Sequence, residues 1–365
     1  MKVLVFSPNW LGDAVMALPA VADIRRHRAT SGLVVAARSS VAGLWTMTAG
    51  VDDVVVIPRA RGAARWRALG ENAEALRRTG SDTAVLLPNS LQTALMARQA
   101  GIPERWGYRR GFRRWLLTRA IPRPGGLVHQ ADYYRRLVAA LGVANGERVP
   151  TLEVPAALVD AARDLLTAGG WTPGTRLLGI APGAAYGGAK RWPPERFAAA
   201  AAQTARVHGL LPVLLGSEAD RAATCAIEAE LGKINAGGWQ AGGRRGQTAA
   251  RMDSEPACRP ATGLVAINLA GRTDIRQLAG VLALCSVFVS NDSGAMHLAA
   301  AIGTPVVALF GPTDERVTAP LAARVRILTA AAWCRPCLLR ECPLDHRCMN
   351  GIDAGAVAAA AGELL

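Results

Sequence analysis

Short apolar runs alternate with segments of helical periodicity from the first residues of the chain onward. Lys2–Ser7 and Leu33–Ala37 are rich in Val, Leu and Ala, which is typical of buried parallel strands. Between them, residues 13–28 carry apolar side chains at helical spacing. Further predicted elements of this half are strands over Val54–Ile57 and Thr83–Leu87 and helices over Glu71–Arg78 and Leu91–Ala100. Strands that alternate with helices predict βαβ units and a parallel sheet.

The alternation restarts after Pro155 and continues through the second half. The strands predicted there are Leu177–Ile180, Leu211–Leu215, Leu264–Leu269, Val287–Ser290 and Val306–Phe310. The predicted helices are Asp160–Ala168, Pro194–His208, Ala219–Leu231, Ile275–Ala283 and Ala295–Ile302. Two Rossmann-like halves in tandem fit this pattern best, with an N-terminal domain over residues 1–155 and a C-terminal domain over residues 156–365.

A stretch rich in glycine interrupts the second half. Residues 232–263 lack the periodicity of the flanking segments and mix glycine with polar residues. This composition predicts a flexible loop inserted between a helix and a strand, either a functional lid or a tolerated insertion.

Composition and charge narrow the class of protein. The 365 residues are 51% hydrophobic and 19% charged, which excludes a disordered chain and allows two full domain cores. The net charge of +14 favours anionic partners, namely nucleic acid, acidic lipid headgroups or phosphorylated substrates. Residues 1–150 hold 22 Lys and Arg against 10 Asp and Glu, a net +12, and the remainder carries only +2. The split predicts different partners for the two halves.

Neither a signal peptide nor a membrane-spanning stretch is predicted. Pro8, Asn9 and Asp13 interrupt the first apolar run before it reaches the roughly seven residues of a signal-peptide core. No uninterrupted apolar stretch approaches the ~20 residues that span a bilayer. Four of the seven cysteines lie in one short segment, unlike a secreted disulfide framework. We therefore expect a soluble cytoplasmic protein that touches a membrane surface.

The first candidate site is Ser7–Asp13, which follows the first predicted strand. Open α/β sheets place their ligand crevice at this end of a strand, and Gly12 allows close approach to the backbone. Asp13 stands at the start of a helix, whose dipole favours an ionised carboxylate, so it suits a base or a plain N-cap equally well. The segment lacks the GxGxxG pattern of dinucleotide-binding folds, which disfavours a dehydrogenase.

The second candidate site is the glycine-rich segment Ala181–Pro193, which also follows a predicted strand. Three glycines followed by Lys190 and Arg191 form a candidate phosphate cradle of backbone N–H groups and fixed positive charge. The alternative is an ordinary glycine loop with solvated basic residues. The Gly-Lys-Ser/Thr ending of a Walker motif is absent, which disfavours P-loop hydrolysis.

The third candidate site is Ser290–Pro305, which combines a strand end, a polar turn and a short helix. Asp292 and Ser293 are placed to cap the helix, and its first N–H groups suit a diphosphate. His297 lies one turn inside the helix, where it either packs in the core or donates a hydrogen bond to a phosphate.

Four cysteines form a fourth cluster near the C-terminus. Cys334, Cys337, Cys342 and Cys348 are close enough in sequence to bind structural Zn²⁺ tetrahedrally. Their spacing is not that of two paired CxxC knuckles, and a packed turn of reduced cysteines is the alternative.

The fifth feature is a run of eight arginines between Arg98 and Arg123, with one acidic residue among them. Trp106, Tyr108, Phe112 and Trp115 are interleaved with these arginines. Basic and aromatic residues in this mixture favour binding of nucleic acid or an anionic glycolipid surface over a solvated face.

Together these segments resemble the ADP-heptose:lipopolysaccharide heptosyltransferases over nearly the whole chain. The resemblance is most specific in Asn9–Asp13, Pro182–Pro193 and Asn291–His297, and Cys334–Cys348 is similar to the type II members. The inserted loop at 232–263 departs from the compact family pattern.

The resemblance implies a GT-B glycosyltransferase with two Rossmann-like domains facing across a cleft. The N-terminal domain would bind the acceptor, a Kdo–lipid A core carrying one heptose, at the inner face of the inner membrane of a Gram-negative bacterium. The C-terminal domain would bind ADP-L-glycero-β-D-manno-heptose, and the C-terminal helix would pack back on the N-terminal domain. Neither a cofactor nor a catalytic metal is expected.

The resemblance also implies roles for single residues. Asp13 is expected to be the catalytic base of an inverting transfer, and Lys190 to stabilise the departing ADP. The other residues expected to bind the donor are Gly183, Ala184, Gly216, Ser217, Glu218, Asp292, Ser293, Gly294 and His297. Those expected to bind the acceptor are Asn9, Trp10, Gly12, Arg109, Arg110, Arg113 and Arg114.

Three alternatives stay open on the sequence alone. They are a heptosyltransferase of type I or III, another nucleotide-sugar enzyme on the same scaffold such as an epimerase, and a nucleic-acid-binding protein. The nucleic-acid-binding alternative rests on the net charge alone. Because the basic excess lies in the half without phosphate-cradling loops, it points to a phosphorylated glycolipid, and we expect no nucleic acid.

Overall fold

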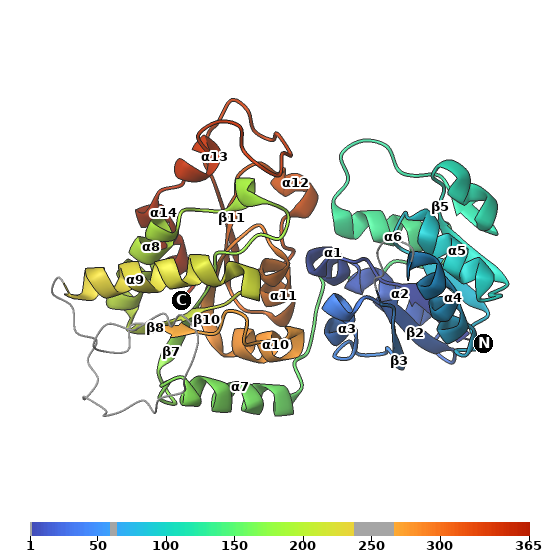
Figure 1. Cartoon of the computed structure of the whole chain (residues 1–365), viewed down its shortest axis with the longest axis horizontal. Coiled ribbons are helices and arrows are strands. Elements are labelled where there is room, and N and C mark those ends of the chain that lie inside the picture. Colours follow the sequence, from blue (N-terminus) through green and yellow to red (C-terminus); the bar gives the residue numbers. More distant parts are fainter. Residues whose placement is uncertain (1, 59–63, 237–265) are drawn as a thin grey trace. The chain divides into compact units, whose positions relative to one another are not determined.

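The computed structural model describes residues 2–58, 64–236 and 266–365 (Figure 1). The chain divides into two units. Unit 1 comprises Met1–Glu153 and Arg316–Ala322, and unit 2 comprises Val154–Glu315 and Ala323–Leu365. Each unit contains one six-stranded sheet in which all the pairings are parallel. The α/β class predicted from the alternating pattern is confirmed.

The sheet of unit 1 has the strand order β3-β2-β1-β4-β5-β6. Its strands are β1 (Lys2–Phe6), β2 (Gly32–Ala37), β3 (Asp53–Val56), β4 (Thr83–Leu86), β5 (Glu104–Tyr108) and β6 (Arg119–Ile121). Four of the five residues of β1 are buried, because a central parallel strand is covered on both faces. The order reverses direction beside β1, so the ends of β1 and β4 form the position where doubly wound sheets bind ligands.

Unit 1 contains six helices and one short 3₁₀ helix in the described residues. They are α1 (Leu11–Met16), α2 (Leu18–His27), α3 (Ser39–Trp45), α4 (Ala64–Arg77), α5 (Leu91–Gln99), η1 (Gly111–Leu116) and α6 (Gln130–Ala140). The single helix predicted over residues 13–28 is wrong, because α1 ends before α2 begins. Pro19 lies in the first turn of α2, where it lacks the N–H that would continue α1.

The sheet of unit 2 repeats the same arrangement, with the order β12-β11-β10-β7-β8-β9. Its strands are β7 (Arg176–Ala181), β8 (Leu210–Leu214), β9 (Ile267–Asn268), β10 (Cys285–Asn291), β11 (Val306–Phe310) and β12 (Val325–Thr329). Here the order reverses between β7 and β10. The second and third candidate segments follow these two strands directly, so they lie together at the ligand-binding end of the sheet.

Helices cover both faces of the second sheet. Figure 1 shows α8, α9 and α14 on one side of its strands and α10 and α11 on the other. The helices of the C-terminal half of the chain are α7 (Ala156–Ala168), η2 (Gly188–Lys190), α8 (Pro194–His208), η3 (Glu218–Asp220), α9 (Arg221–Ala236), α10 (Ile275–Leu284), α11 (Gly294–Ile302), α12 (Glu315–Thr318), α13 (Arg347–Asn350) and α14 (Ala354–Glu363). Of these, α12 falls mostly in the segment Arg316–Ala322 that groups with unit 1.

The C-terminal helix belongs to the core of unit 2. Val357, Ala361 and Leu364 join the apolar cluster that also contains Phe197 of α8, and α14 packs along α8. The resemblance implied that this helix packs back on the N-terminal domain, whereas the contacts just described lie within unit 2. The segment that groups with unit 1 is Arg316–Ala322.

The inserted loop predicted over residues 232–263 falls largely outside the described residues. Its first part is helical, because α9 continues to Ala236 and so extends five residues past the predicted end. In the ranges that the structure describes, no helix is long and apolar enough to cross a membrane.

Candidate functional site

The glycine-rich loop after β7 is closed at both ends by one side chain. Asn291 ends β10, beside β7, and is fully buried. Its Nδ2 donates to the carbonyl of Pro182 (2.6 Å), and its Oδ1 accepts from the backbone N–H of Trp192 (3.2 Å). The loop over residues 182–192 therefore starts and returns at a single anchor, which fixes its shape. The sequence motif contained Asn291, but only the fold shows this use of it.

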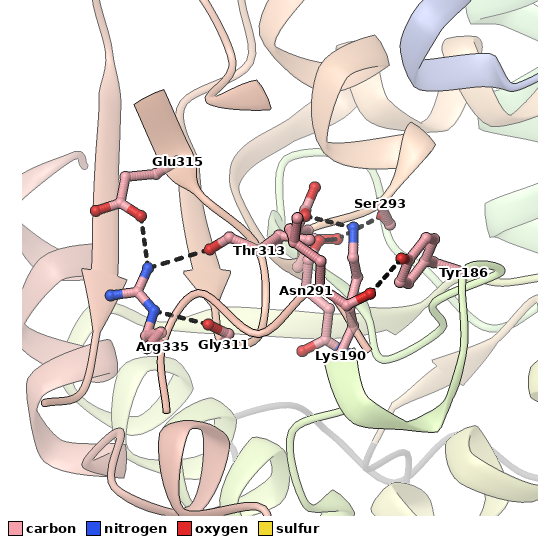
Figure 2. A network of polar contacts seen from close by, with 11 residues as sticks. Tyr186, Lys190, Asn291, Ser293, Gly311, Thr313, Glu315 and Arg335 are labelled. Carbon is pink, nitrogen blue, oxygen red and sulfur yellow. Dashed lines mark hydrogen bonds and ion pairs between the residues drawn. The ribbon is translucent and has the colours of Figure 1, made fainter. Parts of the chain in front are cut away.

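Lys190 is held in this loop by a buried ion pair. Its Nζ lies 2.5 Å from Oδ2 of Asp292, which also accepts from Oγ1 of Thr313 (2.6 Å). The side chain of Asp292 is 5% exposed and that of Lys190 is 11% exposed. The ring of Tyr186 lies 4.8 Å from the same Nζ (Figure 2). The network fixes a positive charge at the ligand-binding end of the second sheet and neutralises it with Asp292.

The N-terminus of α11 lies next to this pair. Ser293 is the N-cap residue, but its side chain makes no capping hydrogen bond, and its Oγ lies 3.0 Å from Oγ of Ser290. The predicted capping by Asp292 and Ser293 is therefore wrong, because Asp292 contacts Lys190 and Thr313 instead. The helix α11 begins at Gly294, and the N-cap side chain does not bond to its first N–H groups. First-turn N–H groups in this arrangement suit an anion.

Besides Asp292, two further predicted donor residues are buried. His297 is 5% exposed inside α11, and Ala184 is buried within the glycine-rich loop. Ala184 therefore offers a ligand only its backbone. For His297, burial fits the interpretation as a packed residue better than that as a surface donor.

Asp220 joins two of the predicted donor loops and was missed by the sequence analysis. Its Oδ2 accepts from the backbone N–H (2.9 Å) and the Oγ (2.7 Å) of Ser217. A methyl group at Gly183 would lie 2.5 Å from this carboxylate, and one at Gly216 would lie 2.9 Å from its Cβ. Both positions therefore require glycine, because a larger side chain would clash with Asp220. Glu218, by contrast, is exposed and pairs with Arg221 (3.1 Å).

In unit 1, the loop after β1 leads into α1 with Asp13 at its third position. Trp10 is the N-cap residue, so the interpretation of Asp13 as an N-cap is wrong. Asp13 is half-buried, whereas Asn9 and Trp10 are exposed. Burial and, second, the negative charge of Asp13 hold the pKa of Tyr134 well above its usual range. The carboxylate therefore lies near the phenol of α6, at the ligand-binding end of the first sheet, with Gly12 beside it.

The 3₁₀ helix η1 forms the middle of the arginine-rich segment and separates buried from exposed arginines. Arg109, Arg110 and Arg114 are exposed, but Arg113 is only 1% exposed. Its guanidinium donates to Oδ1 of Asn89 (3.1 Å), and burial lowers its pKa to about 10. Because side chains three residues apart share a face of a 3₁₀ helix, Arg113 and Leu116 both point inward. The prediction of Arg113 as a surface residue that binds the acceptor is wrong.

The opposite face of η1 carries two exposed aromatic side chains. Phe112 is 84% exposed and Trp115 is 70% exposed. The guanidinium of Arg114 lies 4.1 Å from the ring of Trp115. The surface formed by Arg109, Arg110, Phe112, Arg114 and Trp115 is called the η1 surface below.

The four clustered cysteines form no metal centre in the structure. Within residues 2–58, 64–236 and 266–365, no group of three or more His, Cys, Asp or Glu side chains is placed to hold a metal ion. Cys348 is buried, Cys334, Cys337 and Cys342 are half-buried, and all four are free thiols. Burial and, second, the neighbouring thiols raise the pKa of Cys348. In the described residues the cysteines are therefore not arranged as the Zn²⁺ site considered from the sequence, and a packed turn of reduced cysteines stays the alternative prediction.

The comparisons with known proteins agree with this geometry. The model of "Glycosyltransferase family 9 (heptosyltransferase)" matches residues 69–237 and 245–347. Lipopolysaccharide heptosyltransferase 2 of Salmonella typhimurium is 29% identical over 90% of this chain and 88% of its own length. Lipooligosaccharide heptosyltransferase 2 of Haemophilus ducreyi is 30% identical over the same shares.

A solved structure extends the similarity to the whole fold. The structure of ADP-heptose lps heptosyltransferase II from E. coli matches with a TM-score of 0.78 and 25% identity, over 100% of this chain and 98% of that one. The GT-B architecture expected from the sequence is confirmed, and so is the assignment as a glycosyltransferase. The chain belongs to glycosyltransferase family 9, the heptosyltransferases.

Proposed function

We propose that the protein transfers L-glycero-D-manno-heptose from ADP-heptose to the first heptose of the lipopolysaccharide inner core, with inversion at the anomeric carbon. The observation that carries the proposal is the buried Lys190–Asp292 pair beside the uncapped start of α11. The similarity to relatives named heptosyltransferase 2, which extends over 88% of their length, supports the type of acceptor.

The donor is assigned to unit 2. The diphosphate of ADP-heptose binds at the N–H groups that begin α11 with Ser293 and Gly294, and Lys190 reaches its oxygens. Asp292 holds the ammonium group of Lys190 in position, so that its charge is in place when the leaving ADP becomes more negative. Gly216 and Ser217 border the adenosine, and the exposed Glu218 accepts from the ribose hydroxyls. These groups supply the positive charge for the leaving group without a cofactor.

The acceptor and the base are assigned to unit 1. The carboxylate of Asp13 takes the proton of the acceptor hydroxyl, whose oxygen attacks the anomeric carbon of the heptose. The bond between that carbon and the phosphate oxygen breaks, and ADP leaves with the electron pair. Because the attack comes from the side opposite the leaving group, the anomeric configuration inverts. Asn9, Trp10 and Gly12 surround the acceptor sugar.

The η1 surface is assigned to the anionic, membrane-embedded acceptor and the inner face of the inner membrane. Its three exposed arginines suit phosphates of lipid A and acidic headgroups. The exposed rings of Phe112, which is apolar, and Trp115, which is amphipathic, suit insertion at the headgroup level of a bilayer. We assign this surface to lipid and expect no nucleic-acid partner.

The test measures release of ADP from ADP-heptose in the presence of three acceptors. The first is Kdo–lipid A without heptose, the second carries one heptose, and the third carries two. We expect release to depend on the acceptor with one heptose. Release with only the first or only the third acceptor would assign the chain to type I or type III, and no release with any of them would reject the proposed function.

A further inference from the structure

A cysteine-rich segment, Trp333–Cys348, is the part of unit 2 that the proposed chemistry does not use. It contains little regular structure before α13, and most of its residues are exposed or half-buried. Its shape is therefore set by its contacts with other loops. These contacts connect it to the two loops that carry Lys190 and Thr313, the partners of Asp292.

The first loop is the glycine-rich loop that carries Lys190. Three hydrogen bonds join it to the cysteine-rich segment: Tyr186 Oη donates to Leu338 O (2.6 Å), Ala189 N to Arg340 O (2.9 Å), and Gly188 N to Oε1 of Glu341 (3.0 Å). The two backbones also approach closely, since a methyl group at Gly187 would lie 2.2 Å from Arg340 O. These contacts involve all four residues that directly precede Lys190.

The second loop follows β11 and carries Thr313. The guanidinium of Arg335, 14% exposed, donates to the carbonyls of Gly311 (2.7 Å) and Thr313 (3.4 Å). It also pairs with Oε2 of Glu315 (2.5 Å), so that all three acceptors lie within five residues of this loop. Figure 2 shows Arg335 facing this loop, and Tyr186 and Lys190 on the first loop. Arg335 thus fixes the backbone of the residue whose hydroxyl donates to Asp292.

Both loops converge on one carboxylate oxygen. Oδ2 of Asp292 accepts from Lys190 and from Thr313. The cysteine-rich segment contacts the chain on either side of this oxygen, through Glu341 towards Lys190 and through Arg335 towards Thr313. If either contact shifts, Lys190 or Thr313 moves relative to Asp292. The position of the ammonium group of Lys190 then changes as well.

We propose that Arg335 and Glu341 are positioning residues for the diphosphate-binding centre formed by Lys190, Asp292 and Thr313. Neither residue touches the reacting atoms. Glu341 holds Gly188, two residues before Lys190, and Arg335 holds the loop of Thr313. The inference rests on the proposed function, because it gives these residues a role only if Lys190 binds the diphosphate of the donor.

The experiment measures binding of ADP by calorimetry and turnover of ADP-heptose in four variants. Glu341→Ala removes the acceptor of Gly188 N, and we expect ADP to bind about 10-fold more weakly. Glu341→Gln keeps a carbonyl acceptor and should restore binding close to wild type. Arg335→Ala should lower kcat/KM for the donor by about 30-fold, and Arg335→Lys by less, since an ammonium cannot reproduce the forked contacts.

The matched controls are Asp345→Asn and Arg347→Ala. Asp345 and Arg347 form an exposed ion pair (2.9 Å) within the same segment, and their side chains pair with each other. These variants should bind ADP as the wild type does. A melting temperature close to wild type in every variant separates positioning from loss of folded protein.

A double-mutant cycle with Lys190→Ala completes the test. If Arg335 and Glu341 act through Lys190, their substitution in the Lys190→Ala background adds little further loss of ADP affinity. Full additivity, or ADP affinity unchanged in Glu341→Ala and Arg335→Ala, would overturn the inference while leaving the donor assignment intact. A wild-type protein that does not bind ADP would overturn the donor assignment, and the positioning role with it.

Discussion

The two sheets share one strand order but prepare their ligand-binding ends in different ways. In unit 1 only a short loop separates β1 from α1, and the first turn of α1 carries the half-buried carboxylate of Asp13. In unit 2 a long glycine-rich loop separates β7 from α8, and Asn291 closes it at both ends. The charged group at the ligand-binding end of unit 2 is the ammonium of Lys190, which is paired with the buried carboxylate of Asp292.

This difference between the segments after β1 and β7 fits the different chemical roles proposed for the two units. A base has to meet an acceptor hydroxyl, so a half-buried carboxylate in the first turn of a helix is sufficient. A group that stabilises a leaving diphosphate has to be fixed before the reaction, because reorganisation would reduce its effect. Equal topology with unequal loops illustrates that the chemistry lies in the loops and not in the fold.

The largest effect is expected from Asp13→Ala and Asp13→Asn. Loss of the base should lower heptose transfer by about 10³-fold or more. Because all the residues assigned to the donor belong to unit 2, affinity for ADP should change by no more than about twofold. Acceptor-dependent ADP release and calorimetry with ADP measure the two quantities. Asp53→Asn, at an exposed carboxylate of the same unit, is the control, and wild-type turnover in Asp13→Asn would exclude Asp13 as the base.

The next largest effect is expected from the ion pair of unit 2. Lys190→Ala should lower turnover by about 10²- to 10³-fold and weaken ADP binding. Removal of one partner also leaves a buried charge, which should lower the free energy of unfolding by about 3 kcal/mol.

The double variant Lys190→Met/Asp292→Leu separates these two consequences. Apolar residues of similar volume should restore most of the unfolding free energy, since a buried pair contributes little net stability. ADP affinity should stay low. Recovery of ADP affinity together with stability would mean that Lys190 acts only through the fold.

The sequence predicted the strands that build both sheet centres, because β1, β7, β10 and β11 are buried apolar runs. It missed the edge strands β6 and β12, whose residues are exposed or half-buried, and also β5, which lies next to β6 and begins with Glu104 and Arg105. Period-2 and apolar-run patterns are weak there, because an edge strand is covered less.

The candidate residues were predictable where one segment carries the chemistry, and not where two segments share it. Lys190 and Asp292 were both found, but their ion pair joins residues 102 positions apart and has no local signal. Asp220 was missed for the same reason, since it acts on Gly183 through space. Arg113 was placed at the surface because a charge count cannot tell which arginine of a 3₁₀ turn points inward.

A smaller effect should come from the η1 surface, which has no counterpart among the features of unit 2 described above. Arg109→Glu, Arg110→Glu and Arg114→Glu together should weaken binding to anionic vesicles by about 10²-fold and reduce its dependence on salt. Sedimentation with vesicles at two salt concentrations measures both. Arg113→Gln should instead lower stability, because it removes the donor to Asn89. Unchanged vesicle binding in the triple variant would make the η1 surface a solvated face.

The smallest expected effect concerns the pH dependence of unit 1, at His129. Burial lowers the pKa of His129 from 6.5, although its Nε2 lies 2.9 Å from the carbonyl of Ala319 and Asp132 is near. The folded unit therefore binds this proton more weakly than the unfolded chain does. The stability due to neutral His129 is complete above the ordinary pKa and is lost as the pH falls towards the lowered value.

Between about pH 7 and pH 5, the melting temperature should consequently fall less in His129→Gln than in the wild type, by about 2 °C or less. His27→Gln, at an exposed residue in the last turn of α2, is the control and should follow the wild type. Thermal melts followed across this pH range measure the difference. Parallel curves for His129→Gln and the wild type would mean that His129 titrates alike in the folded and unfolded chain, so that unit 1 gains no pH sensitivity from the burial of His129.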